Sequence, residues 1–303
     1  MITKDLLSII DLTPEEIIAL VDRAIEFKNG ISPKPLIGCS VMVIFEKPSL
    51  RTRVSFDVGV QQLGGHSIYM SGEEIGLGVR EPLSDIAKVL SRYIDCIVAR
   101  VNDHASLEEL AKYATVPVIN ALSDREHPCQ IMADLQTIKE YKGGLKDQIV
   151  AFVGDGNNVA RSLALALGSL GARFVIASPN DYGLDVATME QARMRALKHG
   201  GEVLITNDPR EAVRGADVVY TDVWVSMGQE SETERRLKAF SGYQVDEELM
   251  CLARPDALFM HDLPAHRGLE ISDEMLEHPQ SVVFDQAENR LHVQKAVMAL
   301  TMR

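Results

Sequence analysis

The sequence predicts an α/β protein built from two doubly wound domains, each with a mostly parallel central sheet flanked by helices. Its 303 residues are enough for two domains of ordinary size, each able to bury its own core. Short apolar runs rich in β-branched residues alternate along the chain with helix-like segments. These runs are continuous rather than alternating in polarity, as expected for parallel strands that are buried on both faces.

The first half of the chain contains four such runs. Strands are expected at residues 40–45, 67–70, 96–100 and 116–120. The first helix has a clear start signal, because Thr13, Pro14 and Glu16 form a capping box with proline at the first helical position. Further helices are expected at residues 54–63 and 131–141.

The second half repeats the alternation and ends in a helix. Strands are expected at residues 149–153, 173–177, 203–206, 218–221, 257–261 and 282–284. Two glycines in the stretch from Lys142 to Lys146 indicate a helix stop and a linker. The predicted domains are therefore residues 1–140 and 146–287, and the C-terminal helix at 288–303 is expected to pack back onto the first domain.

Composition excludes several classes of protein and partner. Hydrophobic residues make up 46% and charged residues 25% of the chain, which is typical of globular rather than disordered or fibrous proteins. The formal charge of -13 argues against nucleic acid and anionic membranes as partners, because binding to either requires a basic face.

Two further patterns bear on location and cofactors. No stretch approaches the roughly 20 apolar residues of a membrane span, and the first residues lack the layout of a signal peptide, so a cytoplasmic location is expected. The four cysteines, at positions 39, 96, 129 and 251, have no paired spacing that would indicate a zinc site or a disulfide framework. We therefore predict no metal and no cofactor.

The most informative stretch runs from Phe45 to Arg53, between a predicted strand and a predicted helix. A strand-to-helix turn presents unpaired backbone N–H groups at the positive end of the helix dipole, which suits an anion. Ser49, Arg51 and Thr52 add two hydroxyls and a guanidinium. The alternative interpretation is a surface turn with solvated arginines.

Other ligand-type groups also follow predicted strands in the first half. Arg100 ends the strand at 96–100, and His127 and Gln130 follow the strand at 116–120. Strand ends of open α/β sheets line the ligand crevice, where an imidazole and an amide can polarise a carbonyl oxygen. In isolation, His127 would more commonly be a structural residue at a helix start.

The second half carries a glycine-rich turn and a polar strand end. Residues 154–158 resemble a dinucleotide-binding turn, but Asn158 and Ala160 break the G-x-G-x-x-G pattern, which argues against a nicotinamide cofactor. Asp222 and Ser226 follow the strand at 218–221, where a carboxylate and a hydroxyl suit a charged amino acid. The alternative is that Asp222 simply caps a helix.

Six motifs, in order along the chain, resemble those of the ornithine carbamoyltransferases, within the aspartate/ornithine carbamoyltransferase family. They are Ser-x-Arg-Thr-Arg from Ser49, His-Pro-Cys-Gln from His127, Asp-Gly-Asn-Asn from Asp155, Asp-x-x-x-Ser-Met-Gly from Asp222, His-x-Leu-Pro-Ala-His-Arg-Gly from His261 and Glu-Asn-Arg-Leu-His from Glu288. The resemblance spans the chain from Leu6 to the last helix. Its fourth motif indicates ornithine rather than aspartate as the acceptor.

The resemblance implies transfer of the carbamoyl group of carbamoyl phosphate to the side-chain amine of L-ornithine, which gives L-citrulline and phosphate. It implies that carbamoyl phosphate is bound by Ser49, Leu50, Arg51, Thr52, Arg100, His127, Gln130, Leu263 and Arg290. It implies that ornithine is bound by Asn158, Asp222, Ser226, Met227 and Asp262, and that the catalytic residues are Arg100, His127 and Asp262. It also implies a homotrimer, or a multiple of trimers, with active sites between subunits.

The chain departs from this family at three positions. Asp262 stands where these enzymes usually have a cysteine, and a carboxylate beside the reacting amine would favour the ammonium form of that amine. Our hypothesis is that Asp262 positions the ammonium and then takes its proton. Leu50 replaces the usual threonine, and Gly76 replaces a glutamine or histidine that reaches the neighbouring subunit.

The residues leave two alternatives open. One is a carbamoyltransferase for another amine acceptor, such as acetylornithine or putrescine. The other is a catalytically silent paralogue that binds ligand. The residues also leave open whether the reaction serves arginine synthesis or runs in the reverse, catabolic direction.

Overall fold

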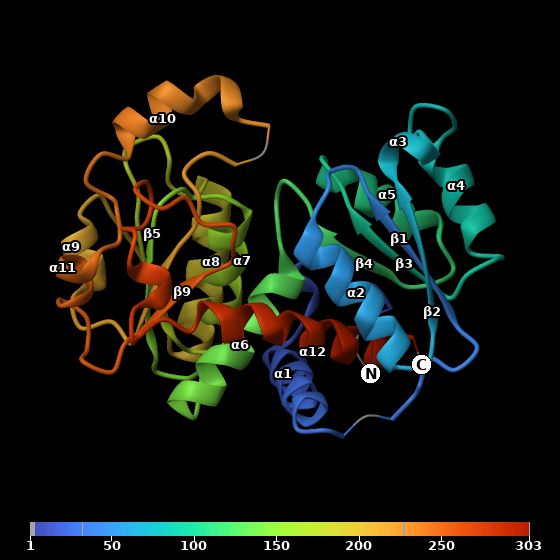
Figure 1. Cartoon of the computed structure of the whole chain (residues 1–303), viewed down its shortest axis with the longest axis horizontal. Coiled ribbons are helices and arrows are strands. Elements are labelled where there is room, and N and C mark those ends of the chain that lie inside the picture. Colours follow the sequence, from blue (N-terminus) through green and yellow to red (C-terminus); the bar gives the residue numbers. More distant parts are fainter. Residues whose placement is uncertain (1–3, 32, 227, 303) are drawn as a thin grey trace. The chain divides into compact units, whose positions relative to one another are not determined.

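The computed structural model describes residues 4–31, 33–226 and 228–302, and the chain divides into two compact units. Unit 1 comprises Met1–Gln136 and Glu288–Arg303, and unit 2 comprises Thr137–Ala287. Each unit holds a parallel sheet flanked by helices (Figure 1), which confirms the predicted fold class. Within the described ranges, no helix is both long and apolar enough to cross a membrane.

The helices and strands alternate along both halves of the chain. The first half contains η1 (Ile9–Asp11), α1 (Pro14–Lys28), β1 (Ser40–Phe45), α2 (Leu50–Gln62), β2 (His66–Ser71), α3 (Gly72–Ile75), α4 (Leu83–Leu90), β3 (Cys96–Arg100), α5 (His104–Tyr113), β4 (Val118–Leu122) and α6 (Pro128–Lys142). The second half contains β5 (Ile149–Val153), α7 (Asn158–Ser169), β6 (Arg173–Ala177), α8 (Val186–His199), β7 (Glu202–Thr206), α9 (Pro209–Val213), β8 (Val218–Thr221), η2 (Glu230–Glu232), α10 (Thr233–Ala239), α11 (Glu247–Met250), β9 (Leu258–His261), η3 (Met275–Glu277) and α12 (Val283–Thr301).

The sheet of unit 1 has the strand order β2-β1-β3-β4, and all its strands are parallel. Met42 and Ile44 of β1 and Ile97 of β3 belong to a buried cluster that also contains side chains of α4 and α5, so these two helices cover one face. Because the strands are parallel, the carboxyl ends of the neighbours β1, β3 and β4 lie along one edge of the sheet.

The N-terminal segment pairs with the outer edge of this sheet. Leu6 forms a bridge with Ile119 of the edge strand β4, and its N–H donates to the carbonyl of Val118 at 3.0 Å. The pairing satisfies backbone groups that an open edge would leave exposed. Helix α1 then begins as predicted, because Thr13 Oγ1 accepts from the Glu16 N–H and the Glu16 carboxylate accepts from the Thr13 N–H.

The sheet of unit 2 has the strand order β7-β6-β5-β8-β9 and is also parallel. On one face, Ala151 and Val153 of β5 belong to a buried cluster with Trp224, Phe240 and Tyr243. Helices α7 and α8 pack against each other and against β6 and β7. The carboxyl ends of the neighbouring strands β5, β8 and β9 therefore lie along one edge, as in unit 1.

One predicted strand is wrong, and two helices begin earlier than predicted. Residues 282–284 form no strand: Ser281 makes an isolated bridge to Phe259, and α12 starts at Val283. A short apolar run has the same pattern in a strand and at a buried helix start, so its periodicity did not separate the two. Helices α2 and α6 begin at Leu50 and Pro128, which places predicted site residues in their first turns.

Candidate active site

The predicted donor residues of unit 1 come from the carboxyl ends of three neighbouring strands. Ser49 and Thr52 follow β1, Arg100 is the last residue of β3, and His127 follows β4. Phe45 pairs with Arg100 in the sheet register, so the end of β1 and the end of β3 are level. Parallel strands of an open sheet thus bring together residues that lie far apart in sequence.

Thr52 lies at the centre of the contacts in this group. Its side chain is fully buried, its hydroxyl lies 3.0 Å from Ser49 Oγ, and the guanidinium of Arg290 donates to the same hydroxyl. Ser49 is the N-cap residue of α2, but its side chain makes no capping hydrogen bond. The first turn of this 13-residue helix therefore keeps the electropositive N-terminus that suits an anion.

His127 is held in its neutral form. Burial lowers the pKa of its imidazole well below the usual value, and the positive charges of Arg290 and Arg100 lower this pKa further. Both arginines are themselves buried, with 4% and 7% of their surface exposed. A neutral imidazole next to two guanidinium groups can donate a hydrogen bond without adding a third positive charge.

Three other predicted donor residues differ in how closely they join this group. Gln130 is fully buried in the first turn of α6, where its Nε2 donates to Asp134 Oδ1 at 2.9 Å. Arg51 is half-buried in the first turn of α2. The apolar side chain of Leu50 is 77% exposed and adds no polar group to the turn.

In unit 2, the predicted acceptor residue Asp222 follows β8 and is 7% exposed. Asn157 Nδ2 donates to Asp222 Oδ2 at 2.6 Å, while Asn157 Oδ1 accepts from the N–H groups of Val159 and Ala160 as the N-cap of α7. The carboxylate of Asp222 is thus oriented by Asn157, the N-cap residue of α7. Asn158, the first residue of α7, is half-buried beside it in sequence.

Asp222 lies close to the end of β9. Ligand atoms of Asp222, His261 and Asp262 all lie within 4.8 Å of one another, a spacing that a metal ion could occupy. However, the Leu263 N–H donates to His261 Nδ1 at 2.9 Å, so the proton of the neutral ring lies on Nε2, 3.2 Å from Glu270 Oε1. Both ring nitrogens are used within the chain, so His261 does not fit the role of a metal ligand.

The segment after His261 is tightly constrained. Leu263 has a positive φ of 59°, and the side chain of Asp262 is 13% exposed. Glu270, fully buried, accepts from the His266 N–H as well as contacting His261. His261 and Glu270 therefore brace the turn that carries Asp262 and Leu263.

Sequence patterns did not indicate the ion pair between Arg236 of α10 and Asp155. Arg236 donates to Asp155 Oδ2 at 2.9 Å and to the Trp224 carbonyl at 3.0 Å. Burial raises the pKa of Asp155 to about 6, although the charge of Arg236 acts in the opposite direction. Arg236 joins the glycine-rich turn to the loop after β8, yet in sequence it sits in a charged run that resembles a solvated helix face.

That loop contains two more predicted acceptor residues. Ser226 is half-buried, and its N–H donates to Gln229 Oε1 at 3.1 Å. Met227 lies outside the described residues. Asn157, which orients Asp222, was also missed as a functional residue, although its place before a helix after a strand is a capping signal that points to it.

Two family models match the chain, one on each side of the linker. The model of the aspartate/ornithine carbamoyltransferase carbamoyl-P binding domain matches residues 4–140, and that of the Asp/Orn binding domain matches residues 146–301.

The relatives similar to this chain span almost its whole length. The anabolic ornithine carbamoyltransferase of Pyrococcus furiosus is 52% identical, with 99% of this chain and 96% of the relative covered. The ornithine carbamoyltransferase of Thermococcus kodakarensis is 51% identical with the same coverage.

Solved structures of carbamoyltransferases also superimpose on nearly the whole chain. The ornithine carbamoyltransferase structure from Pyrococcus furiosus superimposes with a TM-score of 0.95, covering 98% of this chain and 96% of that one. A crystal structure of an N-acetyl-L-ornithine transcarbamylase mutant, 31% identical, superimposes with a TM-score of 0.86 and covers 98% of this chain and 99% of that one.

Proposed function

The chain belongs to the aspartate/ornithine carbamoyltransferase family, and from this membership we propose that it transfers the carbamoyl group of carbamoyl phosphate to the side-chain amine of L-ornithine, giving L-citrulline and phosphate. The observation that carries the proposal is an identity of about half to ornithine carbamoyltransferases over nearly the whole chain. The relative named anabolic supports the direction of citrulline synthesis.

Apart from Leu263, the proposed donor residues all belong to unit 1. We propose that carbamoyl phosphate is bound by Ser49, Leu50, Arg51, Thr52, Arg100, His127, Gln130, Leu263 and Arg290. The buried guanidinium groups of Arg100 and Arg290 support this, because a charge-assisted hydrogen bond to a phosphate contributes about 1.5 to 3 kcal/mol. Leu50 would contribute its backbone N–H alone, since its side chain is exposed.

The same residues suit the chemical step. The amine nitrogen attacks the carbonyl carbon, negative charge grows on the carbonyl oxygen, and the bond to the phosphate oxygen breaks as phosphate leaves. Arg100, Thr52 and neutral His127 would stabilise that oxygen, and losing one such donor typically lowers kcat about a hundredfold to a thousandfold. The leaving phosphate would stay paired with the arginines.

The proposed acceptor site is the polar edge of unit 2. We propose that Asn158, Asp222, Ser226 and Met227 hold the α-amino and α-carboxylate groups of ornithine. The orientation of the Asp222 carboxylate by Asn157 supports a fixed counter-charge for the α-ammonium group. Acetylornithine has a neutral amide at this position, and putrescine lacks the α-carboxylate.

An acceptor screen tests the proposed function against both alternatives. With carbamoyl phosphate as donor, phosphate release is followed for ornithine, acetylornithine, putrescine, lysine and aspartate. We expect release with ornithine alone, and citrulline as its product. Faster phosphate release with acetylornithine would indicate an activity like that named for the 31% identical relative. No release with any acceptor would indicate a silent ligand-binding protein.

Asp262 is proposed as the residue that removes the proton from the reacting amine. With a lysine-like pKa of about 10.4, that amine costs about 4.6 kcal/mol to deprotonate at pH 7. Asp262 is 13% exposed and lies within 4.8 Å of Asp222, so a bound diamine would meet two carboxylates. Of these two, Asp262 would orient the reacting ammonium group and accept its proton during attack.

Substitution of Asp262 tests this role. Asp262→Asn should lower kcat at pH 7 about a hundredfold and shift the kcat profile to higher pH, because only the free amine then reacts. Asp262→Cys, which restores the residue usual in the family, is the matched control and should retain more activity. An Asp262→Asn enzyme with unchanged kcat and pH profile would exclude the role.

The assembly and location are also proposals. We propose a homotrimer with active sites between subunits, as the family resemblance implies. We propose a cytoplasmic location, to which the four free cysteines are suited.

A further inference from the structure

Glu126, the residue directly before His127, is an acidic side chain with only 2% of its surface exposed. The patterns that identified His127 did not indicate it, and the proposed chemistry does not use it. A carboxylate is rarely buried without strong partners, because removing its charge from water is costly. Its partners therefore indicate what it does.

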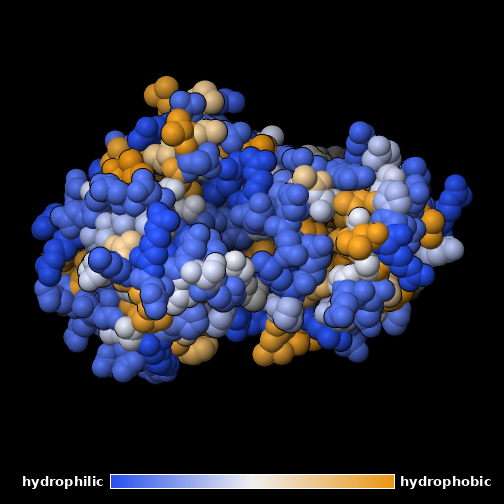
Figure 2. Space-filling model, turned by 90° about the horizontal axis from the view of Figure 1, so that it is seen from above, coloured by the Kyte–Doolittle hydropathy of each residue, from blue (hydrophilic) through white to orange (hydrophobic). Residues whose placement is uncertain are grey.

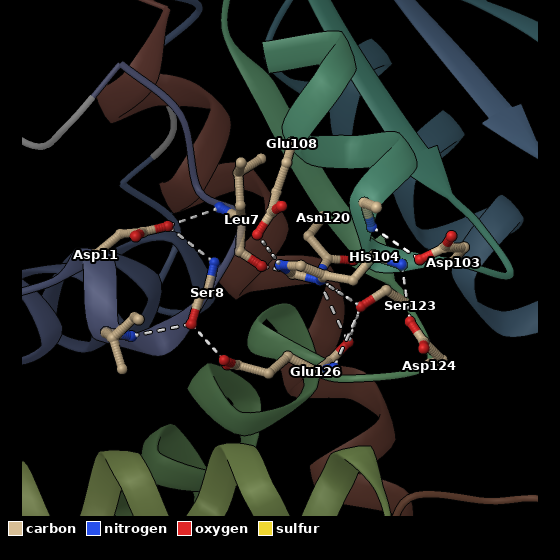
Figure 3. A network of polar contacts seen from close by, with 12 residues as sticks. Leu7, Ser8, Asp11, Asp103, His104, Glu108, Asn120, Ser123, Asp124 and Glu126 are labelled. Carbon is tan, nitrogen blue, oxygen red and sulfur yellow. Dashed lines mark hydrogen bonds and ion pairs between the residues drawn. The ribbon is translucent and has the colours of Figure 1, made fainter. Parts of the chain in front are cut away.

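The side chain of Glu126 binds the N-terminal segment. Ser8 Oγ donates a short hydrogen bond to Glu126 Oε1, and the Ile9 N–H donates to Glu126 Oε2 at 2.9 Å. Figure 3 shows the Ser8 and Glu126 side chains pointing toward one another. Both oxygens of the carboxylate are thus engaged by the start of η1, which lies more than 110 residues earlier in the chain.

The main chain of Glu126 is held as well. Its N–H donates to Ser123 Oγ at 3.2 Å, and its carbonyl accepts from the Ser123 N–H at 3.0 Å. Asn120 Nδ2 reaches the Glu126 carbonyl at 3.4 Å and donates to the Leu7 carbonyl at 2.8 Å. His104 Nδ1 lies 2.7 Å from Ser123 Oγ, so the network of Figure 3 continues into α5.

These contacts fix the residue before His127 at its N–H, its carbonyl and its side chain. The following residues are fixed too, because the His127 carbonyl accepts from the Gln130 and Ile131 N–H groups at 3.0 and 3.2 Å, at the start of α6. The main chain is therefore held on both sides of His127, which limits where its imidazole can lie. A hydrogen-bond donor to a developing negative charge must be held within about 0.5 Å and 10–20° of its working geometry.

We propose that Glu126 is a positioning residue for His127, and that the N-terminal segment from Leu6 to Asp11 is thereby a working part of the donor site. The proposal rests on the proposed function, because it assigns His127 to the carbonyl oxygen of carbamoyl phosphate. Glu126 touches no substrate in this scheme. Its hydrogen bonds to Ser8 and Ile9 hold the turn that carries the His127 imidazole against the N-terminal segment.

The test compares four single variants, one of them a control, and one double variant in steady-state assays with each substrate varied. Ser8→Ala and Glu126→Ala should each lower kcat/KM for carbamoyl phosphate about tenfold to a hundredfold, as misplacement of a reacting group does, and leave the KM for ornithine unchanged. The Ser8→Ala/Glu126→Ala double variant should fall no further than Glu126→Ala alone, because both changes remove the same Ser8–Glu126 hydrogen bond. Ser8→Thr keeps the hydroxyl and should restore activity.

Thr13→Ala is the matched control, since it removes the cap of the next helix, α1, two residues after that segment, without touching Glu126. Its kcat/KM for carbamoyl phosphate should equal that of the wild type. Equal losses in Thr13→Ala and Ser8→Ala, additive losses in the double variant, or an unchanged donor kcat/KM in Ser8→Ala would each overturn the proposal. Failure of the proposed function would differ, because the wild type itself would then form no citrulline.

Discussion

At the scale of single residues, two opposing effects act on the charge of Asp155. Burial raises its pKa to about 6, and the Arg236 guanidinium at 2.9 Å favours the charged form. Since the folded pKa is above the usual 3.8, the folded protein binds more protons than the unfolded chain between about pH 4 and 6. Stability from this group therefore increases as the pH falls through that window, while the ion pair itself is lost.

Protonation of Asp155 thus removes the ion pair without destabilising the fold. We therefore predict that ligand binding at the proposed acceptor site weakens in mild acid while the protein stays folded. L-2-aminopentanoate has the α-amino and α-carboxylate groups of ornithine but no side-chain amine, so its affinity reports the acceptor site alone. With a pKa of about 6, roughly a tenth of Asp155 is ionised at pH 5, and the Kd should rise about tenfold relative to pH 8. Calorimetric titrations from pH 5 to 8 measure this.

Asp155→Asn supplies the control for that titration. The Asp155→Asn protein should have a high Kd for L-2-aminopentanoate throughout the range, with little change between pH 5 and 8. If the Asp155→Asn protein kept the same rise in Kd toward pH 5, another group would be responsible.

At the scale of elements, the β5–α7 turn positions the proposed acceptor residues through a close approach of two main-chain segments. The Gly156 N–H donates to the Tyr182 carbonyl at 2.7 Å. A Cβ on Gly156 would lie 2.3 Å from the carbonyl carbon of Gly183 and 2.4 Å from the nitrogen of Leu184. Backbone atoms cannot rotate away as a flexible side chain does, so the turn itself would have to shift, and Asn157 with it.

Gly156→Ala should therefore lower both stability and acceptor binding. Displacing packed backbone costs about 1 to 3 kcal/mol, which chemical denaturation would detect as a lower unfolding midpoint. The Kd for L-2-aminopentanoate should rise because Asn157 no longer orients Asp222. Gly144→Ala is the matched control, since nothing lies within 4 Å of a Cβ built there, and both measurements should match the wild type.

At the scale of the whole molecule, exposed apolar side chains bear on the proposed trimer. The hydrophobic residues on the face seen in Figure 2 form separate patches within a mostly hydrophilic surface. In unit 1, Val79 is 91% and Tyr93 is 75% exposed. Val79 lies three residues after Gly76, a position that the family resemblance implies is near a neighbouring subunit. Apolar groups this exposed are often covered by another chain.

A trimer of this 33.4 kDa chain would have three times that mass in sedimentation equilibrium. Val79→Glu should lower the observed mass toward that of the monomer, because a carboxylate would be buried at the contact. Val186→Glu in unit 2 changes a side chain that is 74% exposed and should leave the mass unchanged. A monomeric wild type, or equal effects of the two substitutions, would contradict this assembly.

Much of the fold and the candidate site could be predicted because their signals are local in the chain. Nine of the ten expected strands are present in the structure, since a buried parallel strand is a continuous apolar run. The turn at Ser49 and the residue Asp222 could be predicted as candidates because each follows such a strand, where open sheets gather ligand groups. The exception, residues 282–284, is an apolar run that is helical because it opens the long helix α12.

The amino-acid sequence by itself thus determined the two parallel sheets and the identity of the groups at their carboxyl ends, because patterning and strand-end position are properties of short segments. Only the tertiary structure decided how those groups are charged and held. Neutral His127 depends on burial beside Arg100 and Arg290. Ser8 lies 118 residues from Glu126 in the chain, and Arg236 lies 81 residues from Asp155. Desolvation and long-range hydrogen bonds exist only after the chain has packed, so no local pattern encodes them.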